Sequence, residues 1–61
     1  MERKYKLLIV DDEKNLRTEF QNYFASEGFI VETADDGITG LEKLRADEFD
    51  VAIVDLKMPK Y

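Results

Sequence analysis

Apolar residues form short blocks along the chain that predict three strands with longer segments between them. Residues 7–10 and residues 51–54 are continuous aliphatic runs, which are typical of strands buried on both faces of a parallel sheet. Residues 29–31 form a further apolar run, and the strand that it predicts can continue as far as Thr33.

The first intervening segment, residues 13–27, has the spacing of a helix with one buried face. Its apolar side chains recur at helical intervals, and we expect them to lie in the core: Leu16, Phe20, Tyr23 and Phe24. Asp12 stands where an N-cap is needed, and Gly28 stands where a left-handed residue would end the helix.

The second segment predicts a shorter helix. Ile38, Leu41 and Leu44 recur at helical spacing, and Gly40 weakens the helix because glycine has a low helical propensity. Residues 35–37 (Asp-Asp-Gly) provide the turn and the cap before it. After the last apolar run, residues 56–61 predict a loop, because the proline in this stretch lacks an amide hydrogen and disfavours helix at the residue before it.

The resulting order, βαβαβ, indicates the α/β fold class. Parallel strands joined by helices make right-handed crossovers, and we expect a doubly wound, flavodoxin-like parallel sheet with the strand order 2-1-3. No internal repeat or change of composition divides residues 1–61, so we expect a single domain. A doubly wound domain normally continues with further βα units, and we interpret the chain as the first half of one.

Acidic residues directly follow the first and the third predicted strands. Asp11 and Asp12 come after the first strand, and Asp55 comes after the third. In the order 2-1-3 these strands are neighbours, and ligands bind at their carboxyl ends, where the strand order reverses. We expect the three carboxylates to converge, with a hard cation such as Mg²⁺ offsetting their repulsion. Acids after a strand can equally be caps or solvated loop residues, and for Asp11 and Asp12 alone both interpretations stay open.

Composition excludes several other kinds of site. The 61 residues include no cysteine and no histidine, which removes disulfides, thiolate metal sites and the commonest general base. Fourteen acids against nine bases give a formal net charge of -5, which argues against direct nucleic-acid binding. We expect the basic N-terminal residues to be solvated. The four aliphatic residues after them are too few for a signal peptide or a membrane span, so we expect a cytoplasmic protein.

Three stretches together resemble the receiver domains of bacterial two-component response regulators. They are LLIVDDE, TADDGITGLEKL and DVAIVDLKMP, and they match the family's pattern in order and spacing over residues 5–60. The resemblance implies a phosphoprotein module of phosphorelay signal transduction rather than an enzyme. Such a module receives its phosphoryl group from a sensor histidine kinase.

The resemblance also implies a role for each matching position. Asp55 matches the phosphoacceptor, which would carry an aspartyl phosphate. Asp12 is similar to the residue that binds Mg²⁺ directly, and Asp11 to the one that acts through water. Asp55 and the backbone carbonyl of Lys57 would complete the protein ligands. An aspartate-nucleophile phosphatase would require a second acid two residues after the nucleophile, where this chain has Lys57.

The matching residues cover fewer than three of the family's five βα units. The family's hydroxyl after strand four and lysine after strand five contact the phosphoryl group and have no counterpart here, so we expect a truncated receiver with impaired phosphotransfer. The alternative is a self-associating structural half-domain without phosphotransfer. In either case residues 51–54 would form an open sheet edge, and we expect a homodimer in which two third strands meet or elements are exchanged.

Overall fold

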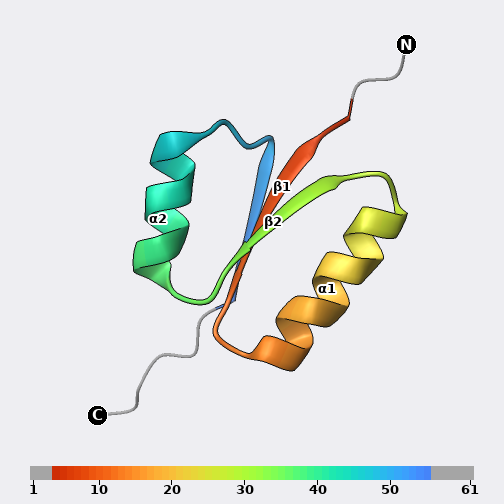
Figure 1. The fold of residues 1–61 in the computed structure, drawn as a ribbon, viewed down its shortest axis with the longest axis horizontal. Coiled ribbons are helices and arrows are strands. Elements are labelled where there is room, and N and C mark those ends of the chain that lie inside the picture. Colours follow the sequence, from red (N-terminus) through yellow and green to blue (C-terminus); the bar gives the residue numbers. More distant parts are fainter. Residues whose placement is uncertain (1–3, 56–61) are drawn as a thin grey trace.

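A computed structural model describes residues 4–55, and its strands form one parallel sheet. The spatial order is β2-β1-β3, and the strands are β1 (Lys6–Asp11), β2 (Ile30–Ala34) and β3 (Val51–Asp55). Helices α1 (Lys14–Ser26) and α2 (Gly37–Ala46) lie on opposite faces of this sheet (Figure 1). The predicted α/β class, the βαβαβ order and the strand order 2-1-3 are confirmed.

Strand β1 is the centre of the core. Its aliphatic side chains, from Leu7 to Val10, are each at most 3% exposed, because β1 has a strand on both edges and a helix on both faces. On the α2 face, Leu8 and Val10 pack with Ala34 and with the half-buried Phe49. The prediction that residues 7–10 form a strand buried on both faces is confirmed.

Helix α1 begins one residue later than predicted. Its N-cap is Glu13, whose side chain makes no capping hydrogen bond, so the prediction that Asp12 caps the helix is wrong. The cause lies at Asp11, whose Oδ1 accepts a hydrogen bond from the Glu13 amide at 2.9 Å. This local turn, of a kind that aspartate favours, keeps Asp12 outside the helix.

The end of α1 follows the prediction for Gly28. Its φ is +99°, in the left-handed region that glycine adopts without a Cβ penalty. The Gly28 amide donates to the Ala25 carbonyl at 3.1 Å. The Phe29 amide donates to the Phe24 carbonyl, also at 3.1 Å, and the two rings meet edge to face. These contacts form a Schellman cap, and β2 therefore begins at Ile30 rather than at Phe29.

The apolar stripe of α1 is less buried than its spacing predicts. Leu16, Phe20 and Phe24 are only half-buried. Tyr23 is 58% exposed, so the expectation that it lies in the core is wrong. The helix packs on β1 and β2 but not on β3, and side chains on the β3 side of the helix therefore stay uncovered.

Helix α2 approaches β1 closely at Gly40. A Cβ added to Gly40 would lie 2.8 Å from Val10 Cγ2, so only a residue without a side chain lets the helix and the strand meet there. Gly40 thus has a packing role that helical propensity does not indicate. Asp36 caps the helix as predicted, because its Oδ1 accepts a hydrogen bond from the Thr39 amide at 2.7 Å. This bond holds the pKa of Asp36 below its ordinary value.

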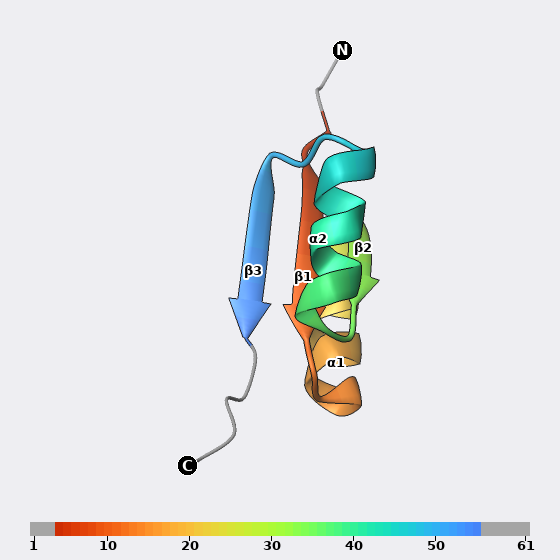
Figure 2. The ribbon, with the colours of Figure 1, turned by 90° about the vertical axis from the view of Figure 1, so that its left-hand side faces the viewer.

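Strand β3 differs most from its prediction. The sequence predicts a buried strand, yet Val51 and Val54 are 47% and 61% exposed, and within β3 only Ile53 is half-buried. The reason is that β3 pairs with β1 along one edge while neither helix packs on it. Figure 2 shows β3 standing apart from both helices at one edge of the sheet.

A polar clasp, formed by Lys6, Glu32 and Asp47, ties the start of β1 to its neighbours. Lys6 Nζ lies 3.3 Å from Glu32 Oε2, donates to Asp47 Oδ2 and sits over the Phe49 ring. The hydrogen bond with Asp47 is the main cause of a raised Lys6 pKa, and the same bond lowers the pKa of Asp47. The expectation that the basic N-terminal residues are solvated is therefore wrong for Lys6.

Neither helix within residues 4–55 combines the length and the apolar character that crossing a membrane requires. The predicted loop at residues 56–61 lies outside the described residues.

Candidate functional site

The parallel register of β1 and β3 places Asp11 beside Asp55. The two residues are Cα partners at the carboxyl ends of their strands, and neighbouring strands in a sheet lie about 4.8 Å apart. Side chains alternate between the faces of a sheet, and Val10 packs on the α2 face, so Asp11 and its partner belong to the α1 face. The structure thus brings together one predicted site residue from each of these two strands.

Asp11 is held in a buried position that leaves part of its carboxylate without a partner. Its side chain is 2% exposed, and Oδ1 is occupied by the Glu13 amide. No donor among the described residues forms a hydrogen bond with Oδ2, although this atom is buried. A buried carboxylate oxygen without a donor is unfavourable by itself, and a cation or a cation-bound water would satisfy it.

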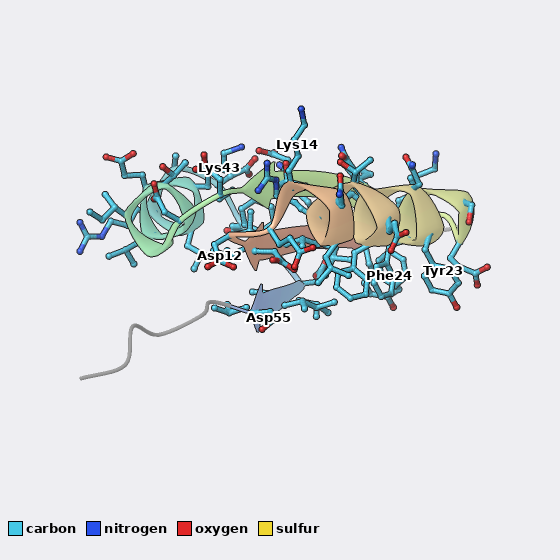
Figure 3. The ribbon with its side chains drawn as sticks, turned by 90° about the horizontal axis from the view of Figure 1, so that it is seen from below. Asp12, Lys14, Tyr23, Phe24, Lys43 and Asp55 are labelled. Carbon is cyan, nitrogen blue, oxygen red and sulfur yellow. The ribbon has the colours of Figure 1, made fainter. Side chains whose placement is uncertain are left out.

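Asp12 and Asp55 lie at the surface beside this buried acid. Both are exposed, and Figure 3 shows them on the ends of neighbouring strands at the same end of the sheet. Within residues 4–55, no three side chains of the metal-binding types lie close enough together to hold an ion. Lys57, whose carbonyl was expected to contribute, lies outside the described part of the chain.

Arg17 is a neighbour of this site that the sequence did not indicate. Its Nη1 donates to the main-chain carbonyl of Asp11 at 2.8 Å, and the side chain is half-buried. The guanidinium therefore brings a positive charge to the acidic end of the sheet and fixes the backbone where β1 ends. Arg17 and Asp11 are six residues apart, and this spacing alone does not indicate the contact.

The second acidic pair is not part of this site. Asp35 and Asp36 follow β2, which lies on the other side of β1 from β3. Asp36 is engaged as the cap of α2. The structure thus separates the acids that cap a helix from those that end β1 and β3.

The residues present suit a hard divalent cation. The donors are carboxylate oxygens, which Mg²⁺ and Ca²⁺ prefer, and the orphaned Oδ2 of Asp11 needs a positive partner. A site with few protein ligands and room for water favours Mg²⁺. Among the predicted ligands, the structure pairs Asp11 with Asp55, and these two do not form a cluster of three with Asp12 in the described part of the chain.

The parallel sheet of order 2-1-3 has the arrangement of a doubly wound domain, and acidic residues end its first and third strands at the switch point. The chain matches the family model described as the response regulator receiver domain over residues 7–61. This match covers most of the chain, and the protein belongs to that family.

Several curated proteins are similar to this chain. A probable transcriptional regulator, ycf27, of Guillardia theta is 40% identical over 60 residues, which are 98% of this chain and 24% of that protein. The transcriptional regulatory protein DltR of Streptococcus agalactiae is 36% identical over 55 residues, 90% of this chain and 25% of the relative. The response regulator MprA of Mycobacterium ulcerans is 33% identical over 55 residues, 90% of this chain and 24% of the relative.

The chain thus spans about a quarter of the length of these relatives. No solved structure matches the chain with significance.

Proposed function

We propose that this chain is the phosphoacceptor segment of a two-component response regulator and that Asp55 accepts the phosphoryl group. The observation that carries this proposal is the register that sets Asp55 directly beside the buried Asp11, in a chain of the receiver family. Asp55 is exposed, so a phosphodonor can reach its carboxylate. Relatives of this chain are named as transcriptional regulators, and we propose that the response regulator controls transcription.

The proposed reaction is a single phosphoryl transfer. An Asp55 carboxylate oxygen attacks the phosphorus of a phosphohistidine on a sensor kinase. A P–O bond forms, the P–N bond breaks, and its electron pair returns to the histidine nitrogen. The product is an aspartyl phosphate on a signalling module. Because this chain contains no histidine, the phosphoryl group must come from a partner or from a small phosphodonor.

The neighbouring acids have a supporting role in the proposal. Asp11, Asp12, Asp55 and the Lys57 carbonyl are the proposed ligands of Mg²⁺, and the orphaned Oδ2 of Asp11 supports a cation at this position. When bound, the ion would neutralise the carboxylates and the phosphoryl oxygens, which otherwise repel each other. Arg17 would hold the end of β1 in place through the Asp11 carbonyl.

We propose further that the 61 residues alone transfer phosphate poorly. They include no counterpart of the hydroxyl and the lysine that contact the phosphoryl group in receiver domains. One preorganised donor of this kind is commonly worth about two to three orders of magnitude in rate. Without both donors, transfer is expected to be about four to six orders slower if the two effects are additive.

Intact-mass analysis after incubation with acetyl phosphate tests the proposal. We expect a phosphoryl adduct on only a small fraction of the chains, dependent on Mg²⁺ and absent from Asp55→Ala. Asp35→Ala is the matched control, because it removes an exposed acid that follows β2, on the other side of β1 from β3. This variant should behave like the parent chain.

Each other outcome has a definite meaning. An adduct that persists in Asp55→Ala would contradict the assignment of the acceptor. A rapid, complete adduct that Asp55→Ala abolishes would support the acceptor and contradict the proposed impairment. No adduct at all, together with no cation binding at the acids, would favour the self-associating structural half-domain instead.

A further inference from the structure

The turn between β1 and α1 is bonded at both ends to one residue of the helix, Arg17. The Arg17 amide donates to the Glu13 carbonyl at 2.9 Å, and Nη1 of the same residue donates to the Asp11 carbonyl at 2.8 Å. Inside the turn, the Glu13 amide donates to Asp11 Oδ1 at 2.9 Å. We propose that Arg17 is a positioning residue that keeps this turn rigid and thereby makes the candidate cation site favour Mg²⁺ over Ca²⁺.

This inference rests on the cation site of the proposed function and concerns how Asp11 is presented to the ion. The main-chain carbonyl and one carboxylate oxygen of Asp11 are both engaged, which restricts the tilt of its peptide and the rotation of its side chain. The side chain is buried, and Oδ2 is left without a donor among residues 4–55. Oδ2 is therefore held in one position at the end of β1, in the residue that pairs with Asp55.

Arginine is well suited to hold this turn. A hydrogen bond from a charged donor is stronger than one from a neutral donor, and the planar guanidinium loses little freedom when it binds. The Arg17 side chain is half-buried, in a helix that packs on β1. The N-cap residue of α1, Glu13, makes no side-chain capping bond. The bond from Arg17 to the Asp11 carbonyl thus ties the first turn of the helix directly to the end of the strand.

The rigidity of the turn affects the two cations differently. Mg²⁺ requires nearly ideal octahedral geometry, whereas Ca²⁺ accepts flexible and irregular sets of oxygen ligands. A carboxylate oxygen in a fixed position therefore favours Mg²⁺, and a mobile one reduces this preference. The positive charge of Arg17 has a separate effect, because it repels both divalent ions to a similar extent. The ratio of the two affinities consequently reports rigidity and not charge.

Separate titrations with Mg²⁺ and with Ca²⁺, followed by amide chemical shifts at Asp11 and Asp55, measure this ratio. Arg17→Met keeps the length of the side chain but removes its donors. We expect the ratio of Mg²⁺ affinity to Ca²⁺ affinity to fall about tenfold, an effect common when a residue that orients a metal ligand is lost. Arg45→Met removes the same charge at an exposed position in the last turn of α2, and should leave the ratio unchanged.

An unchanged ratio in Arg17→Met would overturn the proposal, whether both affinities rise, fall or stay the same. If circular dichroism shows that this variant is unfolded, Arg17→Lys replaces it. Lysine keeps the charge without the planar guanidinium, and the ratio should fall in the same direction. Absence of shifts at Asp11 and Asp55 in the parent chain with either ion would overturn the cation site as well. The phosphoryl adduct would still decide separately whether Asp55 is the acceptor.

Hydrogen exchange in the absence of divalent cations tests the rigidity of the turn by itself. In Arg17→Met the Glu13 amide should exchange about tenfold faster, because Arg17 no longer supports the bond that this amide makes with Asp11. The Thr39 amide makes the same kind of bond with Asp36 at the start of α2, and should exchange as in the parent chain. Equal exchange of the Glu13 amide in variant and parent would show that Arg17 does not hold the turn and would overturn the proposal.

Discussion

Asp11 and Asp55 end two paired strands, yet their surroundings differ. Asp11 is 2% exposed and keeps Oδ2 without a hydrogen-bond donor among the described residues, whereas Asp55 is exposed. Desolvating a carboxylate without full compensation lowers stability. The burial of Asp11 suits a cation ligand, because a cation would compensate its unpaired oxygen. The exposure of Asp55 suits a nucleophile, because a phosphodonor can reach its carboxylate. At the scale of single residues, the proposed division of roles thus follows from burial.

Asp11→Asn should raise the free energy of unfolding in the absence of divalent cations. The amide oxygen can keep the bond from the Glu13 amide, while the change removes a buried charge beside Asp55. An uncompensated buried charge is more unfavourable than a neutral polar group, and we expect a gain of about 1 kcal/mol. Urea denaturation measures it, with Asp35→Asn as an exposed control. Equal or lower stability of Asp11→Asn would show that its carboxylate is already compensated.

Gly40→Ala should destabilise the chain although alanine is the better helix former. The new Cβ would lie 2.8 Å from Val10 Cγ2, and Val10 is itself 3% exposed and cannot move freely. We expect a net loss of about 1–2 kcal/mol, because overpacking of a core commonly costs about 1–3 kcal/mol and exceeds the gain in propensity. A double-mutant cycle with Val10→Ala should show coupling between the two sites. Additive losses would place the strain elsewhere.

At the scale of elements, the boundaries follow local hydrogen bonds more closely than apolar runs. The turn at Asp11 delays α1, and the Schellman cap at Gly28 moves the start of β2 past Phe29. The polar clasp holds the start of β1 to the loop that precedes β3, through the bond from Lys6 to Asp47. We expect the bond between Lys6 and Asp47 to make the stability of the fold depend on pH, because it lowers the pKa of Asp47.

Acid should weaken this clasp. The pKa of Asp47 is lowered by its bond with Lys6, so its contribution to stability is present above its ordinary pKa of 3.8 and is lost as the pH falls through the lower value of the folded chain. Asp47→Asn should therefore reduce stability near neutral pH and flatten the fall in stability below about pH 4. Thermal melts across this range measure the effect, with Glu48→Gln as the neighbouring control. If Asp47→Asn loses stability below about pH 4 as steeply as the parent chain does, the bond with Lys6 contributes nothing to stability.

The sequence predicts the order and type of every element, because hydrophobic spacing reports which segments form strands and helices. The sequence does not predict how much of each element is buried by neighbouring elements. Val51 and Val54 have the pattern of a buried strand, but burial depends on whether a helix packs across β3, and neither described helix does. Tyr23 is exposed for the same reason. The close packing at Gly40 and the contact of Arg17 with the Asp11 carbonyl depend on three-dimensional approach, which spacing along the chain does not encode.

At the scale of the whole molecule, one buried strand organises both the core and the candidate site. Strand β1 contributes most of the buried side chains and also carries Asp11, while β2 and β3 flank it. The same arrangement leaves β3 covered on one edge and on neither face. The acidic end of the sheet therefore includes Asp55, at the end of a strand that no described helix covers.

Amide chemical shifts during a titration with Mg²⁺ test most directly whether the acids at the ends of β1 and β3 form a site. We expect saturable shifts that begin at Asp11, Asp12 and Asp55, and we expect Asp12→Ala to abolish them. Weak binding is sufficient, since Asp11 and Asp55 are partners at the ends of paired strands whether or not phosphate is transferred. Shifts spread evenly over all acidic residues, including Asp35 and Asp36, would show nonspecific counterion binding and would contradict a metal-assisted phosphoacceptor site in this chain.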